Sequence, residues 1–177
     1  MIPTFETDRL TLRAFRTEDA PALTGILQQK DVLKYFPGDT VPSVERSERF
    51  ITNQLESWAV KGYAWWAVED RETGALLGWS GLQYLSETDE TEIGYLLHKN
   101  FWGRGLATEG ARVGIRFGFE TIGLEEVIAL AHPENVASRR VMEKMGMSFD
   151  REAEYFDMTV ARYVLRRDAY RRRAGTD

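Results

Sequence analysis

The middle of the chain contains three stretches of strand character separated by short turns. Tyr63 to Glu69 is rich in aromatic and β-branched residues, Ala75 to Leu85 follows a turn that ends at Gly74, and Glu90 to His98 follows a second turn. Consecutive strands joined by short turns pair in antiparallel order. The pattern therefore predicts an antiparallel meander, against which the rest of the chain must pack.

Helical and strand patterns alternate on both sides of this meander. Before it we expect a strand over Arg9–Phe15, helices over Thr17–Gln29 and Ser43–Val60, and a loop over Asp31–Pro42. After it we expect a helix over residues 103–122, a strand over 125–131, a helix over 135–145, and strands over 147–154 and 158–166. The sequence thus predicts an α/β (α+β) fold in one domain, residues 1–177, with a mixed, largely antiparallel central sheet of about seven strands and about four flanking helices.

Composition excludes several kinds of chemistry. The chain has 177 residues, a formal net charge of −5 and no cysteine, so thiolate metal sites and covalent cysteine intermediates are excluded. An acidic chain is a poor general binder of nucleic acid. The N-terminus lacks the pattern of a signal peptide, and no apolar stretch approaches the roughly 20 residues that span a bilayer. We expect a cytoplasmic protein with no metal, no nucleic-acid partner and no membrane partner.

Two glycines one residue apart, Gly103 and Gly105, connect the last strand of the meander to a helix. Glycine lets the backbone approach a ligand closely, and the unpaired amides of the first helical turn favour a phosphate or pyrophosphate. The spacing fits neither a Walker A motif nor a dinucleotide-binding motif, because no Lys-Ser/Thr pair follows and Thr108 replaces the third glycine. A tight connection that binds nothing fits a bare Gly-x-Gly equally well.

A second segment, His132 to Met147, ends a strand and begins a helix near Asn135. Asn135 and Ser138 are three residues apart, so they lie on one face at the start of that helix. In isolation this pattern is explained by helix capping through Asn135.

Taken together, these segments resemble the GNAT superfamily of N-acetyltransferases, and most closely its ribosomal-protein-alanine acetyltransferase (RimJ/RimL-like) branch. The resemblance covers about the whole chain and is carried by residues 7–13, 92–95, 101–109 and 132–138. It implies the GNAT fold, acetyl-CoA as donor and a primary amine as acceptor, either a protein N-terminal α-amine or a small-molecule amine.

The resemblance also implies a set of cofactor contacts. The backbone of Tyr95, Leu96 and Leu97 would pair with the pantetheine arm, and Asn135 would hydrogen-bond that arm. The pyrophosphate would meet the loop made of Trp102, Gly103, Arg104, Gly105, Leu106, Ala107 and Thr108. The chain departs from the superfamily pattern at Asn100 and Trp102, which puts side-chain help to the phosphates in doubt. It also departs at Met142, where many members have a tyrosine acid.

Direct transfer in a ternary complex is the expected mechanism, because no cysteine can carry the acyl group. By resemblance to the branch, Ser138 would hydrogen-bond the departing sulfur, and an amide near Leu96 would meet the oxyanion. Glu92 is the first candidate for the base, although a surface glutamate explains it equally well. The other base candidates are Asp157, Glu154 and His98, whereas His132 is expected to order its turn.

The acceptor site is expected at Tyr35, Phe36 and Tyr84 together with Glu92, although aromatic residues are more often part of a core. A non-catalytic coenzyme A-binding sensor or structural module on the same fold is the alternative function. The sequence leaves open the acceptor, the length of the acyl group and a homodimeric state.

Overall fold

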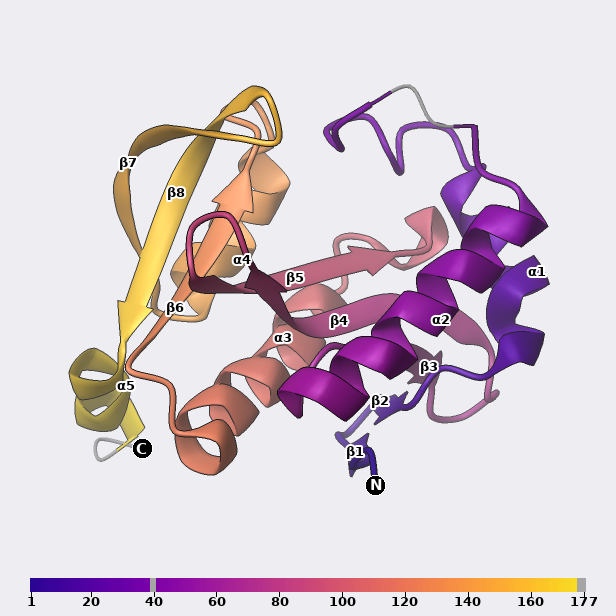
Figure 1. Ribbon diagram of the computed structural model, residues 1–177, viewed down its shortest axis with the longest axis horizontal. Coiled ribbons are helices and arrows are strands. Elements are labelled where there is room, and N and C mark those ends of the chain that lie inside the picture. The colour runs from indigo at the N-terminus through magenta and orange to yellow at the C-terminus, as the bar shows by residue number, and fades with distance from the viewer. Residues whose placement is uncertain (39–40, 175–177) are drawn as a thin grey trace.

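The computed structural model describes residues 1–38 and 41–174. Over these residues eight strands form one sheet in the order β1-β2-β3-β4-β5-β6-β8-β7, and five α-helices pack around it (Figure 1). The strands are β1 (Phe5–Glu6), β2 (Leu10–Arg13), β3 (Trp65–Asp70), β4 (Leu76–Leu85), β5 (Glu90–Leu97), β6 (Glu126–Ala131), β7 (Ser148–Tyr155) and β8 (Met158–Arg166). The helices are α1 (Ala20–Leu27), α2 (Val44–Lys61), α3 (Leu106–Arg116), α4 (Val136–Lys144) and α5 (Arg167–Ala174). The predicted fold class is confirmed, and the predicted element counts are close; β1 and α5 are the elements that were not predicted.

Local capping residues explain where the predicted helices begin and end. The Ser43 side chain accepts a hydrogen bond from the Arg46 amide at the start of α2, and Gly62 ends that helix with φ of +76°. These are ordinary N-cap and C-cap arrangements. The first helix begins later than predicted, because Thr17–Asp19 forms a 3₁₀ turn before α1. The predicted helix over 103–122 is divided into α3 and a π-helical segment, Phe117–Ile122.

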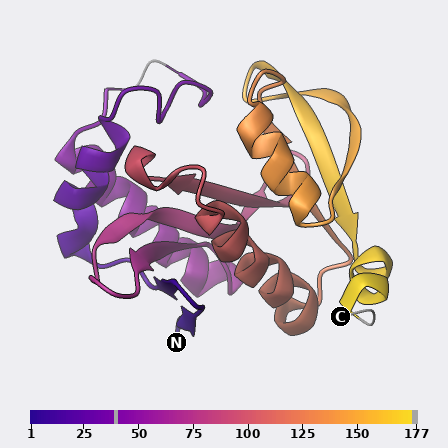
Figure 2. The same ribbon diagram turned by 180° about the vertical axis from the view of Figure 1, so that it is seen from behind.

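The helices cover both faces of the sheet. Helices α1 and α2 lie on one face (Figure 1), and α3 and α4 lie on the other (Figure 2). Helix α3 packs very closely, since a Cβ at Gly114 would stand 2.6 Å from Ile93 Cδ1 of β5. This contact fixes α3 beside β5. None of the helices in the described part of the chain is long and apolar enough to cross a membrane.

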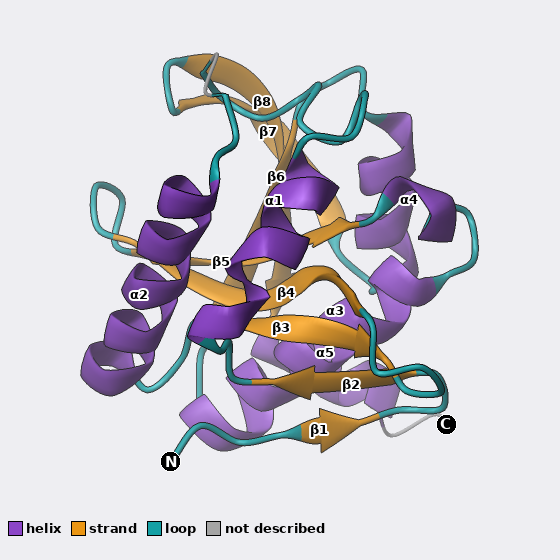
Figure 3. Cartoon of the chain, turned by 90° about the vertical axis from the view of Figure 1, so that its right-hand side faces the viewer, coloured by secondary structure: helices purple, strands orange, loops and turns teal. Residues whose placement is uncertain are grey.

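Strands β5 and β6 diverge and divide the sheet into two halves. Strands β3, β4 and β5 form the predicted antiparallel meander, and β6 to β8 run at a steep angle to the first five strands (Figure 3). The parallel contact between β5 and β6 has a single register pair, Glu92 with Ile128. Beyond that pair the ribbons of the two strands diverge (Figure 1), and we call the region between them the wedge.

Arg162 of β8 closes the narrow end of this wedge. Its side chain, 7% exposed, reaches Glu90 of β5 at 2.6 Å, Glu126 of β6 at 3.1 Å and Asp150 of β7 at 2.7 Å. Glu90 also accepts a hydrogen bond from the Tyr155 hydroxyl at 2.6 Å. Desolvation alone would raise the pKa of Glu90, but the hydrogen bonds from Tyr155 and Arg162 outweigh it and lower that pKa. One buried cation thus joins β5, β6, β7 and β8 next to the Glu92 pair.

Replacing Arg162 should destabilise the fold far more than replacing an exposed arginine. Arg162→Leu leaves three carboxylates without their buried partner, which should lower the free energy of unfolding by about 3 kcal/mol. Arg71→Leu is the control, because Arg71 pairs with Glu6 at 3.2 Å with both side chains about half exposed, and such pairs contribute less than about 1 kcal/mol. Urea denaturation at pH 7 measures the free energy of unfolding of both variants and of the wild type. Equal losses in the two variants would contradict the role given to Arg162.

Candidate active site

The free edge of β5 faces the wedge. The His98 amide donates to the Leu77 carbonyl, which fixes the alternation of hydrogen bonds between β5 and β4. In an antiparallel pair, alternate residues direct their backbone groups to the partner strand. The backbone of Leu96 therefore points to β4, whereas that of Tyr95 and Leu97 points into the wedge. The Leu97 carbonyl already accepts the Trp102 indole N–H at 2.7 Å.

Glu92 lies at the vertex of the wedge. Its register partner on β4 is Gln83, and side chains alternate along β5, so Glu92 shares a face with Leu96. Leu96 packs in a cluster with residues of α1 and α2, which places Glu92 on that face. Desolvation raises the pKa of Glu92 to about 8, a backbone hydrogen bond from Leu130 opposes the shift, and the charge of Glu90 adds to it. A carboxyl with such a pKa can accept a proton near neutral pH.

The predicted glycine loop lies between β5 and α3, with Trp102 to Gly105 exposed. Gly103 has φ of +73° and Gly105 has φ of +80°, a conformation that side chains disfavour. Gly105 is the N-cap of α3 and has no side chain to cap the helix. The amides of Leu106, Ala107 and Thr108 are therefore left for a ligand, at the positive end of the helix dipole.

Arg9 holds this loop from the other end of the chain. Its guanidinium donates to the Arg104 carbonyl at 2.9 Å and pairs with Glu109 at 2.6 Å. Glu109 also accepts hydrogen bonds from the Thr7 hydroxyl at 2.6 Å and from the Arg9 amide at 3.0 Å. The pairing offsets the negative charge of Glu109 in the first turn of α3, where that charge would otherwise oppose an anion.

Asn135 and Ser138 meet Tyr95 at the start of α4. The Asn135 side chain accepts the Ser138 amide at 3.1 Å, so the capping role is present. The Ser138 hydroxyl lies 2.9 Å from the Tyr95 hydroxyl, which also lies 3.0 Å from the Ser138 carbonyl oxygen. Desolvation raises the pKa of Tyr95 above its ordinary range, so the phenol stays protonated. The buried side chain of Met142 follows one turn later and supplies no hydroxyl.

A cavity of about 490 Å³ lies where the loop after α1 approaches the β6–α4 connection and the start of β8. Its lining consists of Lys34, Tyr35, Phe36, His132, Pro133, Met158 and Thr159. The Tyr35 ring stacks on His132, with centroids 5.2 Å apart. The ring centroids of Phe36 and Trp79 lie 6.1 Å apart in an edge-to-face contact. Trp79 stacks on Trp65, with ring centroids 3.9 Å apart. Both indoles lie over the position of a Cβ at Gly94 of β5, so a series of ring contacts joins Phe36 at the cavity to the strand that carries Glu92.

Tyr84 is the predicted acceptor residue that the structure separates from this group. Tyr84 pairs with Thr91 and its neighbour Gln83 pairs with Glu92, so Tyr84 and Glu92 point to opposite faces of the sheet. The Tyr84 hydroxyl donates to Asp89 at 2.8 Å, and Lys61 lies 3.6 Å above its ring. Strict alternation along β4 could have revealed this from the sequence.

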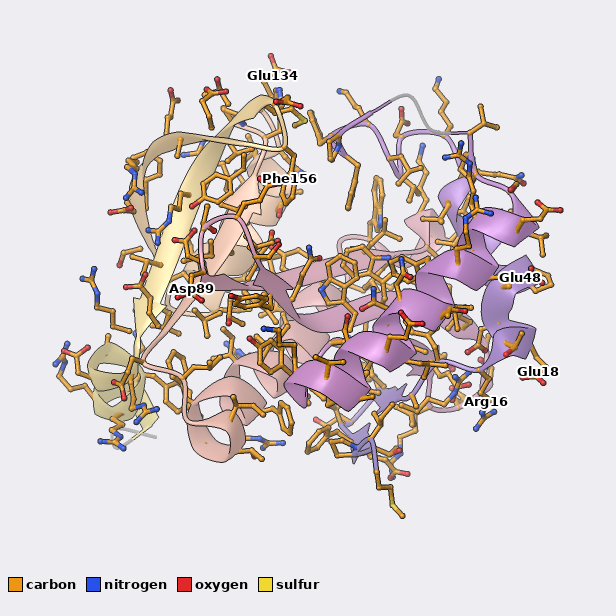
Figure 4. The ribbon with its side chains drawn as sticks, viewed as in Figure 1. Arg16, Glu18, Glu48, Asp89, Glu134 and Phe156 are labelled. Carbon is orange, nitrogen blue, oxygen red and sulfur yellow. The ribbon has the colours of Figure 1, made fainter. Side chains whose placement is uncertain are left out.

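The remaining base candidates have structural partners. His98 Nδ1 accepts the Asn100 amide at 3.1 Å, and His132 Nδ1 accepts the Glu134 amide at 3.2 Å, so each histidine orders its turn. Asp157 belongs to the β7–β8 turn with φ of +59°, and Glu154 accepts a hydrogen bond from Thr159. Phe156 precedes Asp157 in the β7–β8 turn, and Figure 4 shows it at the same end of the molecule as Glu134.

Sequence reasoning did not identify the side-chain roles of Arg9, Tyr95 and Arg162. The partners of Arg9 and Arg162 are as far as 100 and 72 residues away in sequence, and Ser138 is 43 residues from Tyr95. The sequence indicated these roles only through the position of Arg9 and Tyr95, which lie in the segments 7–13 and 92–95 that carry the family resemblance.

Comparisons with known proteins agree with the fold. The model of the acetyltransferase (GNAT) domain matches residues 9–148. The uncharacterized N-acetyltransferase YoaA of Bacillus subtilis is 31% identical over 147 residues, which cover 82% of this chain and 83% of that protein. An acetyltransferase from Agrobacterium tumefaciens superposes with a TM-score of 0.81 at 27% identity, over 93% of this chain and 95% of that one.

The same fold extends to ribosomal-protein acetyltransferases. The ribosomal-protein-S5-alanine acetyltransferase from Vibrio fischeri superposes with a TM-score of 0.80 over 94% of this chain and 97% of that one, at 17% identity. That likeness concerns the fold. The match of the family model to most of the chain decides the family: the chain belongs to the GNAT family and is an N-acetyltransferase.

Proposed function

We propose that this enzyme transfers an acetyl group from acetyl-CoA directly to a primary amine, with Glu92 as general base. The observation that carries the proposal is the position of Glu92, a carboxyl with a pKa of about 8 at the vertex of the β5–β6 wedge. The open backbone edge of β5 and the uncapped end of α3 border the same wedge. A binding module without catalysis would gain nothing from a desolvated carboxyl there.

The residues around the wedge fit acetyl-CoA, which GNAT enzymes generally use. The amides of residues 106–108 and the two left-handed glycines form a cradle for a pyrophosphate. The backbone groups of Tyr95 suit an extended arm that pairs as an added strand. The Asn135 oxygen is engaged by the cap, so its amide N–H₂ is the group left to bind that arm. Acetyl-CoA supplies the activated acetyl thioester when it is bound.

Glu92 would take the proton of the acceptor ammonium from the α1–α2 face of the sheet. The backbone hydrogen bond from Leu130 that opposes the rise in the pKa of Glu92 favours the ionised form, which is the form that accepts the proton. The Tyr95 amide points into the wedge, whereas that of Leu96 points to β4; the oxyanion donor expected near Leu96 is therefore assigned to Tyr95. Ser138 would donate its hydroxyl to the departing sulfur.

The aromatic cavity is the proposed entrance for the acceptor. Tyr35 and Phe36 line it, and Trp79 and Trp65 continue toward Glu92. A protein N-terminus and a small-molecule amine both present a primary amine to such a surface. The name of the Vibrio fischeri ribosomal-protein acetyltransferase supports a protein N-terminus as the first acceptor to test.

The variant Glu92→Gln tests the base. It keeps the shape of the side chain but cannot accept the proton, so kcat/KM should fall about 10²- to 10⁴-fold. In the wild type the rate should rise with pH through about 8, as Glu92 ionises, and this rise should vanish in the variant. Thiol release from acetyl-CoA with a panel of peptides and amines measures both. Glu87→Gln, in the exposed β4–β5 turn, is the control.

The same variant has a stability readout that requires no acceptor. The pKa of Glu92 is higher in the folded state than in the unfolded state, so its ionisation costs stability as pH rises from about 4.5 to about 8. Glu92→Gln should therefore raise Tm relative to the wild type at pH 9, with little difference at pH 5. A difference in Tm that is the same at both pH values would contradict the raised pKa of Glu92 in the folded state.

The variant Ser138→Ala tests the contact with the sulfur. A hydrogen bond to a charged group contributes roughly 1.5–3 kcal/mol, so kcat should fall roughly 10- to 100-fold while the affinity for acetyl-CoA stays unchanged. Val136→Ala removes an exposed side chain from the same helical turn and should leave kcat unaltered. Normal turnover of Ser138→Ala would refute the assignment.

The variant Gly105→Val tests the glycine loop. A β-branched residue at φ of +80° must distort the backbone, so acetyl-CoA binding should weaken at least about 10-fold by calorimetry. Gly74→Val is a matched control, because Gly74 has φ of +70° with nothing near its Cβ position, in the β3–β4 turn. Tight binding by the Gly105 variant would exclude this loop as the pyrophosphate site.

A further inference from the structure

The phenol of Tyr95 is a partly buried polar group that the proposed transfer does not use. Its backbone faces the wedge, but its side chain lies with Ile93 and Leu97 on the α3–α4 face of the sheet. The hydroxyl makes two contacts, both to Ser138 of α4: 2.9 Å to the side-chain oxygen and 3.0 Å to the carbonyl oxygen. The phenol therefore contacts the residue expected to meet the sulfur.

Counting protons at this pair leaves two arrangements. Tyr95 and Ser138 each have one hydroxyl proton. In the first arrangement Tyr95 donates to the Ser138 carbonyl, and Ser138 donates back to the Tyr95 oxygen. In the second, Tyr95 donates to the Ser138 side-chain oxygen, and the Ser138 proton is free for a third acceptor. The two differ only by rotation of hydroxyl protons, because the heavy-atom distances suit both.

We propose that Tyr95 is a positioning residue that directs the Ser138 hydroxyl proton toward the leaving sulfur. The proposal rests on the function proposed above. When negative charge gathers on the sulfur, Ser138 donates to it and Tyr95 donates to Ser138. Each hydroxyl polarises the next, which strengthens both hydrogen bonds. No covalent bond forms or breaks at either residue, and each keeps its own proton.

The surroundings of Tyr95 favour this role. Desolvation keeps the phenol protonated, so its donor is present throughout the working pH range. Met142, one helical turn after Ser138, is 1% exposed and cannot donate. Besides the Asn135 amide N–H₂, which is proposed to bind the pantetheine arm, the side-chain donors described at this end of α4 are the Ser138 hydroxyl and the phenol of β5 behind it.

A purely structural role makes a different prediction. If Tyr95 only anchored α4 through the Ser138 carbonyl, its contribution would not depend on the Ser138 side chain. If it acts through the Ser138 hydroxyl, removing that hydroxyl removes the effect of Tyr95 as well. A double-mutant cycle separates the two.

The test measures the thiolate of bound coenzyme A, so it requires no acceptor. The ultraviolet absorbance of the thiolate is followed from pH 6 to 10 with wild type, Tyr95→Phe, Ser138→Ala and the double variant. Tyr95→Phe should lower the thiolate fraction of bound coenzyme A roughly threefold to tenfold at a given pH, as expected for one lost hydrogen bond. In the Ser138→Ala background the same change should have no further effect. The affinity for acetyl-CoA should be unchanged by Tyr95→Phe.

The outcomes separate the proposals. An unchanged thiolate fraction in Tyr95→Phe, or an equal loss in both backgrounds, overturns the role of Tyr95 while the acetyltransferase function stands. Failure of the wild type to bind either coenzyme A or acetyl-CoA overturns both. Tyr170→Phe is the control, because it removes a hydroxyl that donates to Glu120 at 2.6 Å, between α5 and the π-helical segment after α3. Tm checks that each variant is folded.

Discussion

The ion pairs of the buried Arg162 guanidinium are the interactions on which the proposed site depends. Glu90 and Glu126 each stand two residues before the Glu92–Ile128 pair, on parallel neighbouring strands, where their charges would repel. Arg162 contacts both and reaches Asp150 as well. The contact joins β5 and β6 at one end, and nothing comparable is seen between the described residues that follow on these strands. The wedge can therefore open without dividing the sheet.

A wedge inside a sheet creates a hydrogen-bonding requirement. Backbone groups removed from water without a partner cost free energy, and those of Tyr95 face the wedge, where β6 has turned away. The proposed pantetheine arm, which is extended and contains amides, would satisfy them by pairing with this edge. The same geometry desolvates Glu92 at the vertex. One departure from regular pairing thus yields both a binding edge and a carboxyl of raised pKa.

The sequence predicted features that short-range chemistry determines. The caps at Ser43 and Gly62, the meander and the glycine loop depend on residues close together in the chain, and the structure contains all of them. The sequence could not predict the divergence of β5 and β6, because the residue pattern of a strand is the same whether or not that strand stays paired with its neighbour. The contact of Arg9 with Glu109 spans 100 residues and was likewise out of reach.

The absence of cysteine has a consequence for the site. Without a thiol the chain cannot form an acyl-cysteine intermediate, and in the proposed direct transfer the groups at the wedge act on bound reactants by hydrogen bonding or proton transfer. The groups available there are a carboxyl, two hydroxyls and backbone amides, and they lie on opposite faces of β5: Glu92 on the α1–α2 face, Tyr95 and Ser138 on the α3–α4 face. In the proposed mechanism, proton removal from the acceptor and stabilisation of the sulfur would therefore occur on opposite faces of β5.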